Sequence, residues 1–261
     1  MEKYQITDDD RNRIKLQADK LKISGDKIFA TLQGEGSTTG KKAIFLRLHF
    51  CNLACGKKEG WQCDTGYTWD KDRSEFWQEA EDWTYLETAN RVKLLWSKEF
   101  GHNTPDSQKR IVITGGEPLL QQEKIVKLLE FLSNWNVEIE TNGTIKPDKK
   151  LEPCQINCSP KLANSGNPLE RRYNPEVLIA INEMPNSWFK FVVASVEDLN
   201  EVETIIQECH LQKNKILIMP EGLTLAETTK HLQIIQQEVG QRGWIVAKRK
   251  QLEWFGTKRR T

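Results

Sequence analysis

The stretch RLHFCNLACGKKEGWQCDT, residues 47–65, contains three of the six cysteines of this 261-residue chain. Cys51, Cys55 and Cys63 are separated by three and then by seven residues. Immediately before them, the apolar segment AIFLRL at residues 43–48 is typical of a buried β-strand. The cysteines are therefore expected on a loop that leaves the carboxyl end of a strand, which is where β/α barrels build their active sites.

Three thiolates in one loop are more typical of an iron–sulfur cluster than of structural zinc. Structural zinc usually takes four protein ligands, whereas clusters are held by cysteine thiolates, and three of these leave one iron open to a small molecule. Two simpler interpretations stay open at this point. The loop could hold zinc with His49 as a further ligand, or the cysteines could be ordinary buried residues, because spacing alone does not identify the metal.

Further motifs follow in an order that resembles the radical S-adenosylmethionine (radical SAM) superfamily, in which three cysteines of a CxxxCxxC loop hold a 4Fe–4S cluster. Within it, the chain is similar to the 7-carboxy-7-deazaguanine synthase family over residues 28–222. The shared motifs are TLQGEG (31–36), Arg47, CNLAC (51–55), CDT (63–65), TGGEP (114–118), ETNGT (140–144), SPK (159–161) and MPEG (219–222).

The cysteine loop departs from that family in one respect. The family usually has two residues between the second and third cysteines, and this chain has seven. The extra residues are interpreted as GKKEG at 56–60, because WQCDT resumes the pattern directly afterwards. A polar insert between two glycines is expected to loop out without moving its ends.

Composition excludes several other classes of protein. Lys and Arg number 38 against 37 Asp and Glu, so no nucleic acid partner is expected, and the basic clusters at 248–250 and 258–260 are interpreted as solvated. No apolar run approaches the roughly 20 residues that cross a bilayer, and the N-terminus lacks a signal-peptide core. We expect a cytoplasmic protein with reduced cysteines.

The remaining cysteines do not predict a second cluster. Cys154 and Cys158 repeat the three-residue gap of the first pair, but no third or fourth partner follows nearby. Cys158 lies in a strand-like segment, where small buried cysteines are common. We therefore expect it in the core.

Strand-like and helix-like segments alternate along the chain, which predicts a parallel sheet covered by helices. Strands are expected at 43–49, 110–114, 137–141, 155–159, 188–193 and 215–219, with an extended segment at 28–31 and a short strand at 244–247. Helices are expected at 85–100, at 119–135, after the capping pair Ser195/Asp198, and between the pair Thr224/Glu227 and Gly240.

The resemblance implies a partial, open (β/α) barrel of about six parallel strands. The short 142–151 link is consistent with a lost or shortened helix. A single domain is expected, with an N-terminal extension at 1–23, core motifs at 24–222, an inserted segment at 66–109, and a C-terminal helix and tail at 223–261.

Several residues at strand ends have side chains suited to ligands. In TGGEP the glycines allow close backbone approach and Glu117 can accept from an ammonium group, although a plain strand-to-helix turn has the same pattern. Lys161 and Lys190 are ligand contacts or, more often for such lysines, solvated charges. Arg47 can hold a carboxylate through two hydrogen bonds. The hydroxyl of Thr65 suits magnesium, or caps the following turn.

The resemblance assigns roles to these residues. Cys51, Cys55 and Cys63 are implied to hold the 4Fe–4S cluster, and no side chain is implied to be catalytic because the radical derives from the cofactor. Contacts to S-adenosylmethionine are implied for Gly116, Glu117, Ser159, Pro160, Lys161, Met219, Pro220, Glu221 and Gly222. Substrate contacts are implied for Leu32, Gln33, Gly34, Arg47 and Thr114, and a Mg²⁺ contact for Thr65.

The implied enzyme is a carbon–nitrogen lyase of queuosine and deazapurine biosynthesis. It converts the pterin substrate, 6-carboxy-5,6,7,8-tetrahydropterin, to 7-carboxy-7-deazaguanine by radical ring contraction with loss of ammonia. The resemblance also implies a homodimer and a reducing partner such as flavodoxin or ferredoxin, without a membrane partner.

Two other interpretations are retained. Another radical SAM enzyme, such as a glycyl-radical activase, would be expected to lack the QGEG motif at 33–36 and the CDT motif at 63–65. A non-catalytic zinc-binding or RNA-interacting module would turn its basic tail outward.

Overall fold

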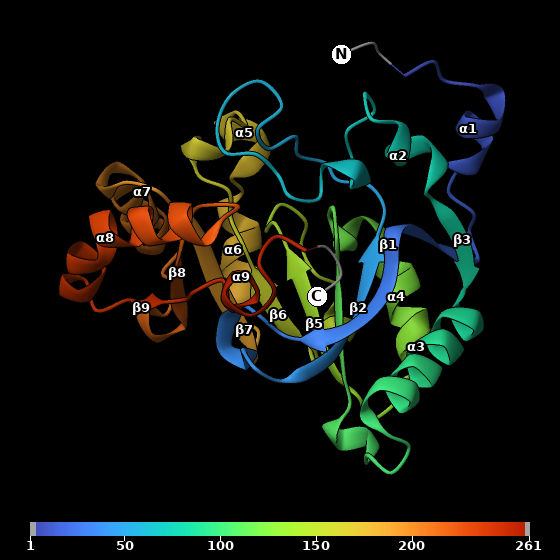
Figure 1. Cartoon of the computed structure of the whole chain (residues 1–261). Helices are drawn as coiled ribbons and strands as arrows, with labels where there is room; N and C mark the ends of the chain where they lie inside the picture. The colour runs from blue at the N-terminus through green and yellow to red at the C-terminus, as the bar shows by residue number, and fades with distance from the viewer. Residues whose placement is uncertain (1–3, 259–261) are drawn as a thin grey trace.

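Nine β-strands form one mixed sheet in this computed structural model, which describes residues 4–258. Their order is β3-β1-β2-β4-β5-β6-β7-β8-β9, and β1 is antiparallel to both of its neighbours whereas β2 and β4 to β9 run parallel (Figure 1). The bounds are β1 Lys20–Leu32, β2 Lys42–Leu48, β3 Glu81–Thr84, β4 Arg110–Gly115, β5 Asn136–Thr141, β6 Gln155–Cys158, β7 Ser187–Val193, β8 Ile216–Pro220 and β9 Ile245–Val246.

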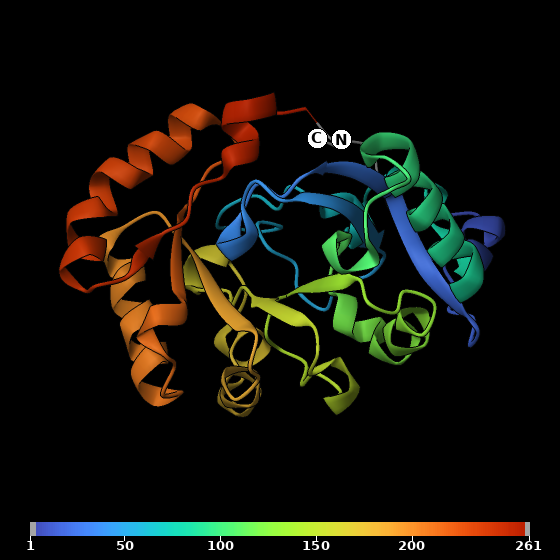
Figure 2. The ribbon, with the colours of Figure 1, turned by 90° about the horizontal axis from the view of Figure 1, so that it is seen from below.

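Helices cover the outer face of this sheet. Figure 2 shows the sheet as an open arc with most of the helices along its convex side. Among residues 4–258, no helix is long and apolar enough to span a membrane. The helices are α1 Asp8–Arg13, α2 Ser74–Gln78, α3 Tyr85–Phe100, α4 Gln122–Leu129, α5 Leu169–Arg172, α6 Pro175–Asn182, α7 Val196–Glu208, α8 Leu225–Gln241 and α9 Lys250–Phe255.

Side chains alternate between the two faces of each parallel strand, as strand geometry requires. In β2, Ile44, Leu46 and Leu48 are buried in the main core, whereas Phe45 and Arg47 line a cavity on the concave face. The later strands turn polar side chains toward that cavity, namely Thr114, Glu140, Asn157 and Lys190. The outer face therefore supplies the apolar core, and the inner face is left for a polar site.

The predicted open parallel α/β sheet is confirmed. Six strands, β2 and β4 to β8, match the six predicted ones, β9 matches the short seventh, and α3 has the predicted bounds. Capping boxes at Ser195 and Thr224 begin α7 and α8. The 142–151 link contains one 3₁₀ turn, Lys149–Leu151, and no α-helix. Cys158 is fully buried in β6, as expected.

Strand β1 begins at Lys20, earlier than the sequence indicated. Leu21 and Ile23, which we assigned to an N-terminal extension, are completely buried in the main core. The charged Lys22 between them hid this strand. Its side chain is itself fully buried, and its ammonium lies 2.7 Å from a carboxylate oxygen of Asp82 in β3. The short strand β3 was not predicted, because its four residues follow no clear apolar alternation.

Helix α1 begins after Thr7, which caps it through a capping box with Asp10. Two other helices differ from the prediction in their bounds. A 3₁₀ turn at Pro118–Gln121 precedes α4, which is therefore shorter than the predicted 119–135. Helix α8 continues past Gly240 to Gln241.

The packing of α3 on the sheet gives a stability prediction. Trp96 is 1% exposed, and its ring lies 4.8 Å from that of Phe100 and 5.6 Å from that of Trp135. Trp96→Ala should lower the free energy of unfolding by about 3–5 kcal/mol, because it leaves a cavity. Leu94→Ala on the same helix, at a 70% exposed position, should change it by less than about 0.5 kcal/mol. Urea unfolding measures both, and equal losses would contradict this packing.

Candidate active site

A cavity of about 650 Å³ lies on the concave face, at the carboxyl ends of the parallel strands, and is of the size usual for ligand sites. It brings together sixteen of the predicted site residues, namely Leu32, Gln33, Gly34, Arg47, Cys51, Cys55, Cys63, Thr65, Thr114, Gly116, Ser159, Lys161, Met219, Pro220, Glu221 and Gly222. Glu117 and Pro160 are not among the described residues that line it.

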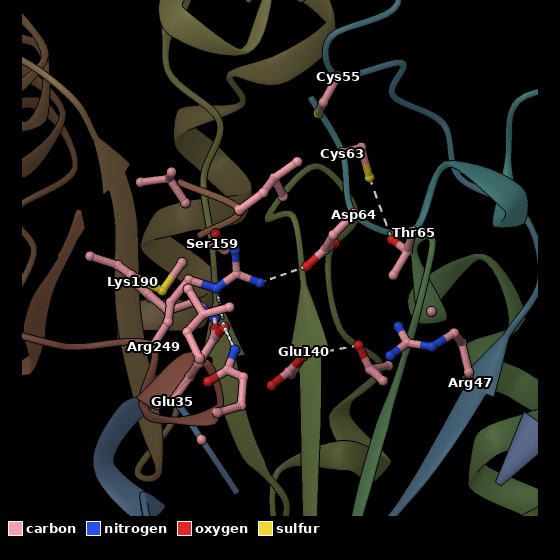
Figure 3. Close-up of a pocket in the computed structure, with 18 of the residues that line it drawn as sticks. Glu35, Arg47, Cys55, Cys63, Asp64, Thr65, Glu140, Ser159, Lys190 and Arg249 are labelled. Atoms are coloured by element: carbon pink, nitrogen blue, oxygen red, sulfur yellow. Dashed lines mark hydrogen bonds and ion pairs between the residues drawn. The ribbon is translucent and has the colours of Figure 1, made fainter. Parts of the chain in front are cut away.

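The three cysteines of the 51–63 loop all line this cavity, and Figure 3 shows Cys55 and Cys63 together at one end of it. All six cysteines of the chain are free thiols. Burial raises the pKa of the Cys51 thiol to about 12 and also raises the pKa of Cys55. Deprotonation of such thiols requires a compensating positive charge, which bound iron supplies.

The arrangement of these thiols fits a cluster better than a single ion. Within residues 4–258, no three His, Cys, Asp or Glu side chains are grouped so that they could hold one metal ion. His49, the further ligand of the zinc interpretation, is fully buried, with its ring 4.6 Å from that of Phe50 and 4.5 Å from that of Phe76. A multi-iron cluster holds each cysteine on a different iron, so the three thiolates need not converge on one ion.

The turn after β4 holds the start of the cysteine loop. Phe50 has a φ of +80°, which is uncommon for a residue with a side chain. Its carbonyl accepts from Glu117 N at 2.8 Å, and its amide donates to Thr68 O at 2.9 Å. A Cβ on Gly116 would lie 2.1 Å from Phe50 O. Glycine is therefore required here for contact with the cysteine loop, in addition to any approach of a ligand.

Glu117 is fully buried, and its carboxylate already has protein donors. One oxygen accepts from Leu119 N and Thr141 Oγ1, both at 2.9 Å, and the other accepts from Asn142 N at 2.7 Å. The structure therefore places Glu117 as a link between the turn after β4 and the end of β5. This differs from the expected contact with the cofactor ammonium.

The ETNGT motif also supports the cysteine loop. Asn142 Nδ2 donates to Asn52 Oδ1 at 2.9 Å, and Asn52 Nδ2 donates to Thr144 Oγ1 at 2.7 Å. Thr144 Oγ1 in turn donates to Asn142 Oδ1 at 2.6 Å. Three side chains in a closed hydrogen-bond ring thus fix the loop between Cys51 and Cys55 on the end of β5.

The expectation that the 56–60 insert loops out freely is wrong. Gly56 N donates to Ser165 O at 3.1 Å, and Trp61 N donates to Asn164 O at 3.0 Å. A Cβ on Gly60 would lie 2.4 Å from Asn164 O. The insert is therefore packed, backbone against backbone, on the loop that follows the SPK motif.

One wall of the cavity carries Arg47. Its guanidinium Nε lies 3.4 Å from Asp26 Oδ2, and its side chain is 14% exposed. Across the floor, Glu140 accepts from Thr114 Oγ1 at 2.9 Å and from Gln33 Nε2 at 3.4 Å. The cavity thus presents a cation beside a carboxylate, which suits a ligand with both an acidic group and an N–H-rich ring.

The opposite wall contains an ion-pair network that is mostly shielded from solvent, with Asp64 at its exposed end (Figure 3). Glu35 pairs with Lys190 and accepts from Arg249 Nε at 3.1 Å, and Arg249 Nη2 donates to Asp64 Oδ2 at 2.7 Å. Burial alone would raise the pKa of Glu35, but Lys190 and Arg249 hold it well below its usual range. Glu35 is therefore ionised.

This network corrects two sequence-based interpretations. Lys190, for which a solvated charge is the more frequent of two open interpretations, and Arg249, which belongs to a cluster interpreted as solvated, are only 12% and 13% exposed and line the cavity. Arg249 belongs to a short basic cluster that local sequence cannot distinguish from a solvated one, and only its distant partners reveal its role. The second cluster, 258–260, lies outside the described residues except for Lys258. Glu140 was missed as well, although it opens a motif that we had identified.

The packed insert predicts different costs for two glycine substitutions. Gly60 has a φ of +89° and no room for a Cβ, whereas Gly101 has a φ of +97° with no atom within 4 Å of one. Gly101→Ala should therefore cost only the backbone strain of about 1–2 kcal/mol. Gly60→Ala should lower the free energy of unfolding, measured in urea, clearly more than Gly101→Ala does. It should also bind less iron than Gly101→Ala after anaerobic reconstitution. Equal losses in the two variants would contradict the packing of the insert.

Comparisons with known proteins show which family the chain resembles. The chain is 31% identical over 238 residues to the 7-carboxy-7-deazaguanine synthase of Pyrobaculum aerophilum, covering 89% of this chain and 94% of that protein. It is 29% identical over 248 residues to the protein of the same name from Rhodopirellula baltica, covering 89% and 86%. No family model matches the chain.

A solved structure supports the fold. QueE from Escherichia coli superposes with a TM-score of 0.64 at 22% identity, over 94% of this chain and 99% of that one. The resemblance inferred from the motifs is confirmed, and the chain belongs to the 7-carboxy-7-deazaguanine synthase family, radical SAM lyases of queuosine biosynthesis that use a 4Fe–4S cluster.

Proposed function

We propose that this chain converts 6-carboxy-5,6,7,8-tetrahydropterin to 7-carboxy-7-deazaguanine by radical ring contraction with loss of ammonia. One observation carries the proposal: the three cysteines, Arg47 and Glu140 face a single cavity at the carboxyl ends of the parallel strands. We also propose that the chain acts as one catalytic domain, because strands of a single sheet and the loops that join them line this cavity together with the C-terminal segment.

The residues present fit a 4Fe–4S cluster and S-adenosylmethionine. Cys51, Cys55 and Cys63 would hold three irons of the cluster and leave the fourth open. When both are bound, they supply the radical that begins the reaction. The residues placed to contact S-adenosylmethionine are Gly116, Ser159, Lys161 and the Met219–Gly222 segment, all of which line the cavity.

The surroundings of the cofactor segments are already ordered by protein contacts. Lys161 Nζ donates to both the carbonyl and the hydroxyl of Ser159 at 2.9 Å. Arg249 Nη1 donates to Gly222 O at 2.7 Å. Lys161 therefore restrains the segment at Ser159, and Arg249 restrains the segment at Gly222. Because these segments are fixed before the ligands bind, the entropic cost of orienting the ligands is lower.

Arg47 and Glu140 are proposed to orient the substrate. Arg47 would pair with the substrate carboxylate through the guanidinium atoms that Asp26 does not contact, because a planar guanidinium offers five N–H donors. Glu140 would accept from the amino edge of the pterin ring, since a carboxylate can take two hydrogen bonds side by side. Leu32, Gln33, Gly34 and Thr114 complete this part of the wall.

Thr65 is proposed as a Mg²⁺ contact. It begins a 3₁₀ turn, yet its hydroxyl makes no capping hydrogen bond and lies 3.4 Å from Cys63 Sγ at the cavity wall. A hydroxyl that does not cap its turn is available to a cation. Magnesium usually keeps several waters and takes oxygens from the substrate, so one protein ligand is sufficient.

Three further features belong to the proposal. Six free cysteines are consistent with work in the cytoplasm, where thiols stay reduced. A single-electron donor such as flavodoxin or ferredoxin would reduce the cluster, and the enzyme would work as a homodimer.

The proposed reaction is tested by anaerobic incubation of the reconstituted protein with the pterin substrate, S-adenosylmethionine, reductant and Mg²⁺. Mass spectrometry should find 7-carboxy-7-deazaguanine and released ammonia with the unmodified protein. Cys63→Ala should give no product, whereas Cys154→Ala, which changes a buried core thiol, should keep its cluster. Product formation by Cys63→Ala at the unmodified rate would refute the assignment of the cluster ligands.

Arg47→Lys should weaken substrate binding by about tenfold or more, because lysine keeps the charge but loses the planar pair of donors. Binding of S-adenosylmethionine should be unchanged. Arg91→Lys, which alters an exposed pair with Glu87 on α3, is the matched control. Calorimetric titration with the substrate measures its dissociation constant in each variant. A dissociation constant that is unchanged in Arg47→Lys would show that Arg47 does not bind the substrate.

Thr65→Val should lower the affinity for Mg²⁺ by at least about tenfold, because it replaces an oxygen ligand with a methyl group of similar size. Turnover should then respond only weakly to added Mg²⁺, while cleavage of S-adenosylmethionine without substrate stays at the unmodified rate. A wild-type Mg²⁺ titration in Thr65→Val would leave Thr65 with only a role in the turn.

A further inference from the structure

Asn167 lies directly behind the cysteine loop, in the segment that follows the SPK motif. Its amide Nδ2 donates to Cys55 Sγ at 3.2 Å, and both residues are buried, at 7% and 6% exposure. This hydrogen bond reaches one of the three sulfurs proposed to hold the cluster. The roles assigned so far do not use Asn167, and it does not belong to any of the motifs that identified the family.

The orientation of the Asn167 amide follows from its other partner. Ala54 N donates to Asn167 Oδ1 at 2.9 Å. A backbone N–H can only donate, so the oxygen of the amide must face Ala54 and the NH₂ group must face Cys55. The same NH₂ group also contacts Ser165 Oγ at 3.2 Å. A rotated amide would place donor against donor at Ala54.

The backbone of Asn167 is fixed by a buried arginine. Arg172 Nε donates to Asn167 O at 3.1 Å, and Arg172 Nη1 donates to Lys161 O at 3.0 Å. Glu201 balances the charge of Arg172, with a contact of 2.5 Å. Asn167 is therefore held in place from behind, with its donor aimed at a sulfur atom.

We propose that Asn167 is a positioning residue that tunes the cluster by donating a hydrogen bond to the Cys55 thiolate. This inference rests on the proposed function, because it requires the cluster. An N–H donor stabilises negative charge on sulfur. The reduced cluster carries one more negative charge than the oxidised cluster, so the donor stabilises the reduced form more and raises the reduction potential. Asn167 thereby eases electron transfer from a single-electron donor.

The test is a redox titration followed by electron paramagnetic resonance of the reduced cluster, on anaerobically reconstituted protein. Asn167→Ala removes the donor and should lower the midpoint potential. Asn167→Asp keeps the acceptor for Ala54 but replaces the donor with a negative charge, so it should lower the potential further. The control is Asn164→Ala in the same loop. The hydrogen bonds of the Asn164 side chain go to Trp61, Val192 and Asp198, with Oδ1 accepting from Trp61 Nε1 at 3.0 Å. Asn164→Ala should retain the wild-type midpoint.

The signal arises only from loaded protein, so the midpoint can be read even where a variant binds less iron. Midpoints in Asn167→Ala and Asn167→Asp that equal or exceed the wild-type value would overturn the inference and leave the proposed function intact. An equal fall of the midpoint potential in Asn164→Ala would also overturn the inference, because the effect would then arise from the loop as a whole and not from the hydrogen bond to Cys55. A wild-type protein without a 4Fe–4S signal would instead overturn the proposed function.

Discussion

The backbone contact between the cysteine loop and the turn after β4 is the constraint on which the site depends. Glu117 N donates to Phe50 O at 2.8 Å, and this approach is possible only because residue 116 has no side chain. The contact forces Phe50 into a left-handed conformation, which places Cys51 at the carboxyl ends of β2 and β4. Strain of this kind persists only where the surrounding structure over-determines it.

The other contacts of the loop extend this arrangement in both directions. Asn52 is held by the end of β5, and Gly56 and Trp61 are held by the loop after β6. Four neighbouring strands of the sheet, β2, β4, β5 and β6, and the turns that follow them therefore support the one short segment that carries all three cysteines. On the far wall, Arg249 ties the C-terminal segment to Asp64 beside Cys63, so this segment completes a site whose three cysteines come from the first half of the chain.

Much of this could be predicted from the sequence, since strands such as β4 and β8 contain the apolar runs IVI and ILIM and the capping pairs mark two helices. The motifs located most of the cavity wall, because most of them lie at or just after the carboxyl end of a strand. What escaped prediction depends on partners far away in the sequence. The buried pair of Lys22 with Asp82 hid a strand, and the pairing of Arg249 with Glu35 made a surface-like cluster part of the site. The insert at 56–60 has a flexible composition, and only its tight fit against Asn164 shows that it is packed.

The central claim is that Cys51, Cys55 and Cys63 hold one cluster despite their unusual spacing. Anaerobic reconstitution followed by iron and sulfide analysis tests it most directly, combined with electron paramagnetic resonance of the reduced protein before and after addition of S-adenosylmethionine. The account predicts about four irons and four sulfides per chain, with a signal that changes when S-adenosylmethionine binds the open iron. A protein that takes up one zinc ion in place of the cluster, or a signal that S-adenosylmethionine leaves unchanged, would contradict it.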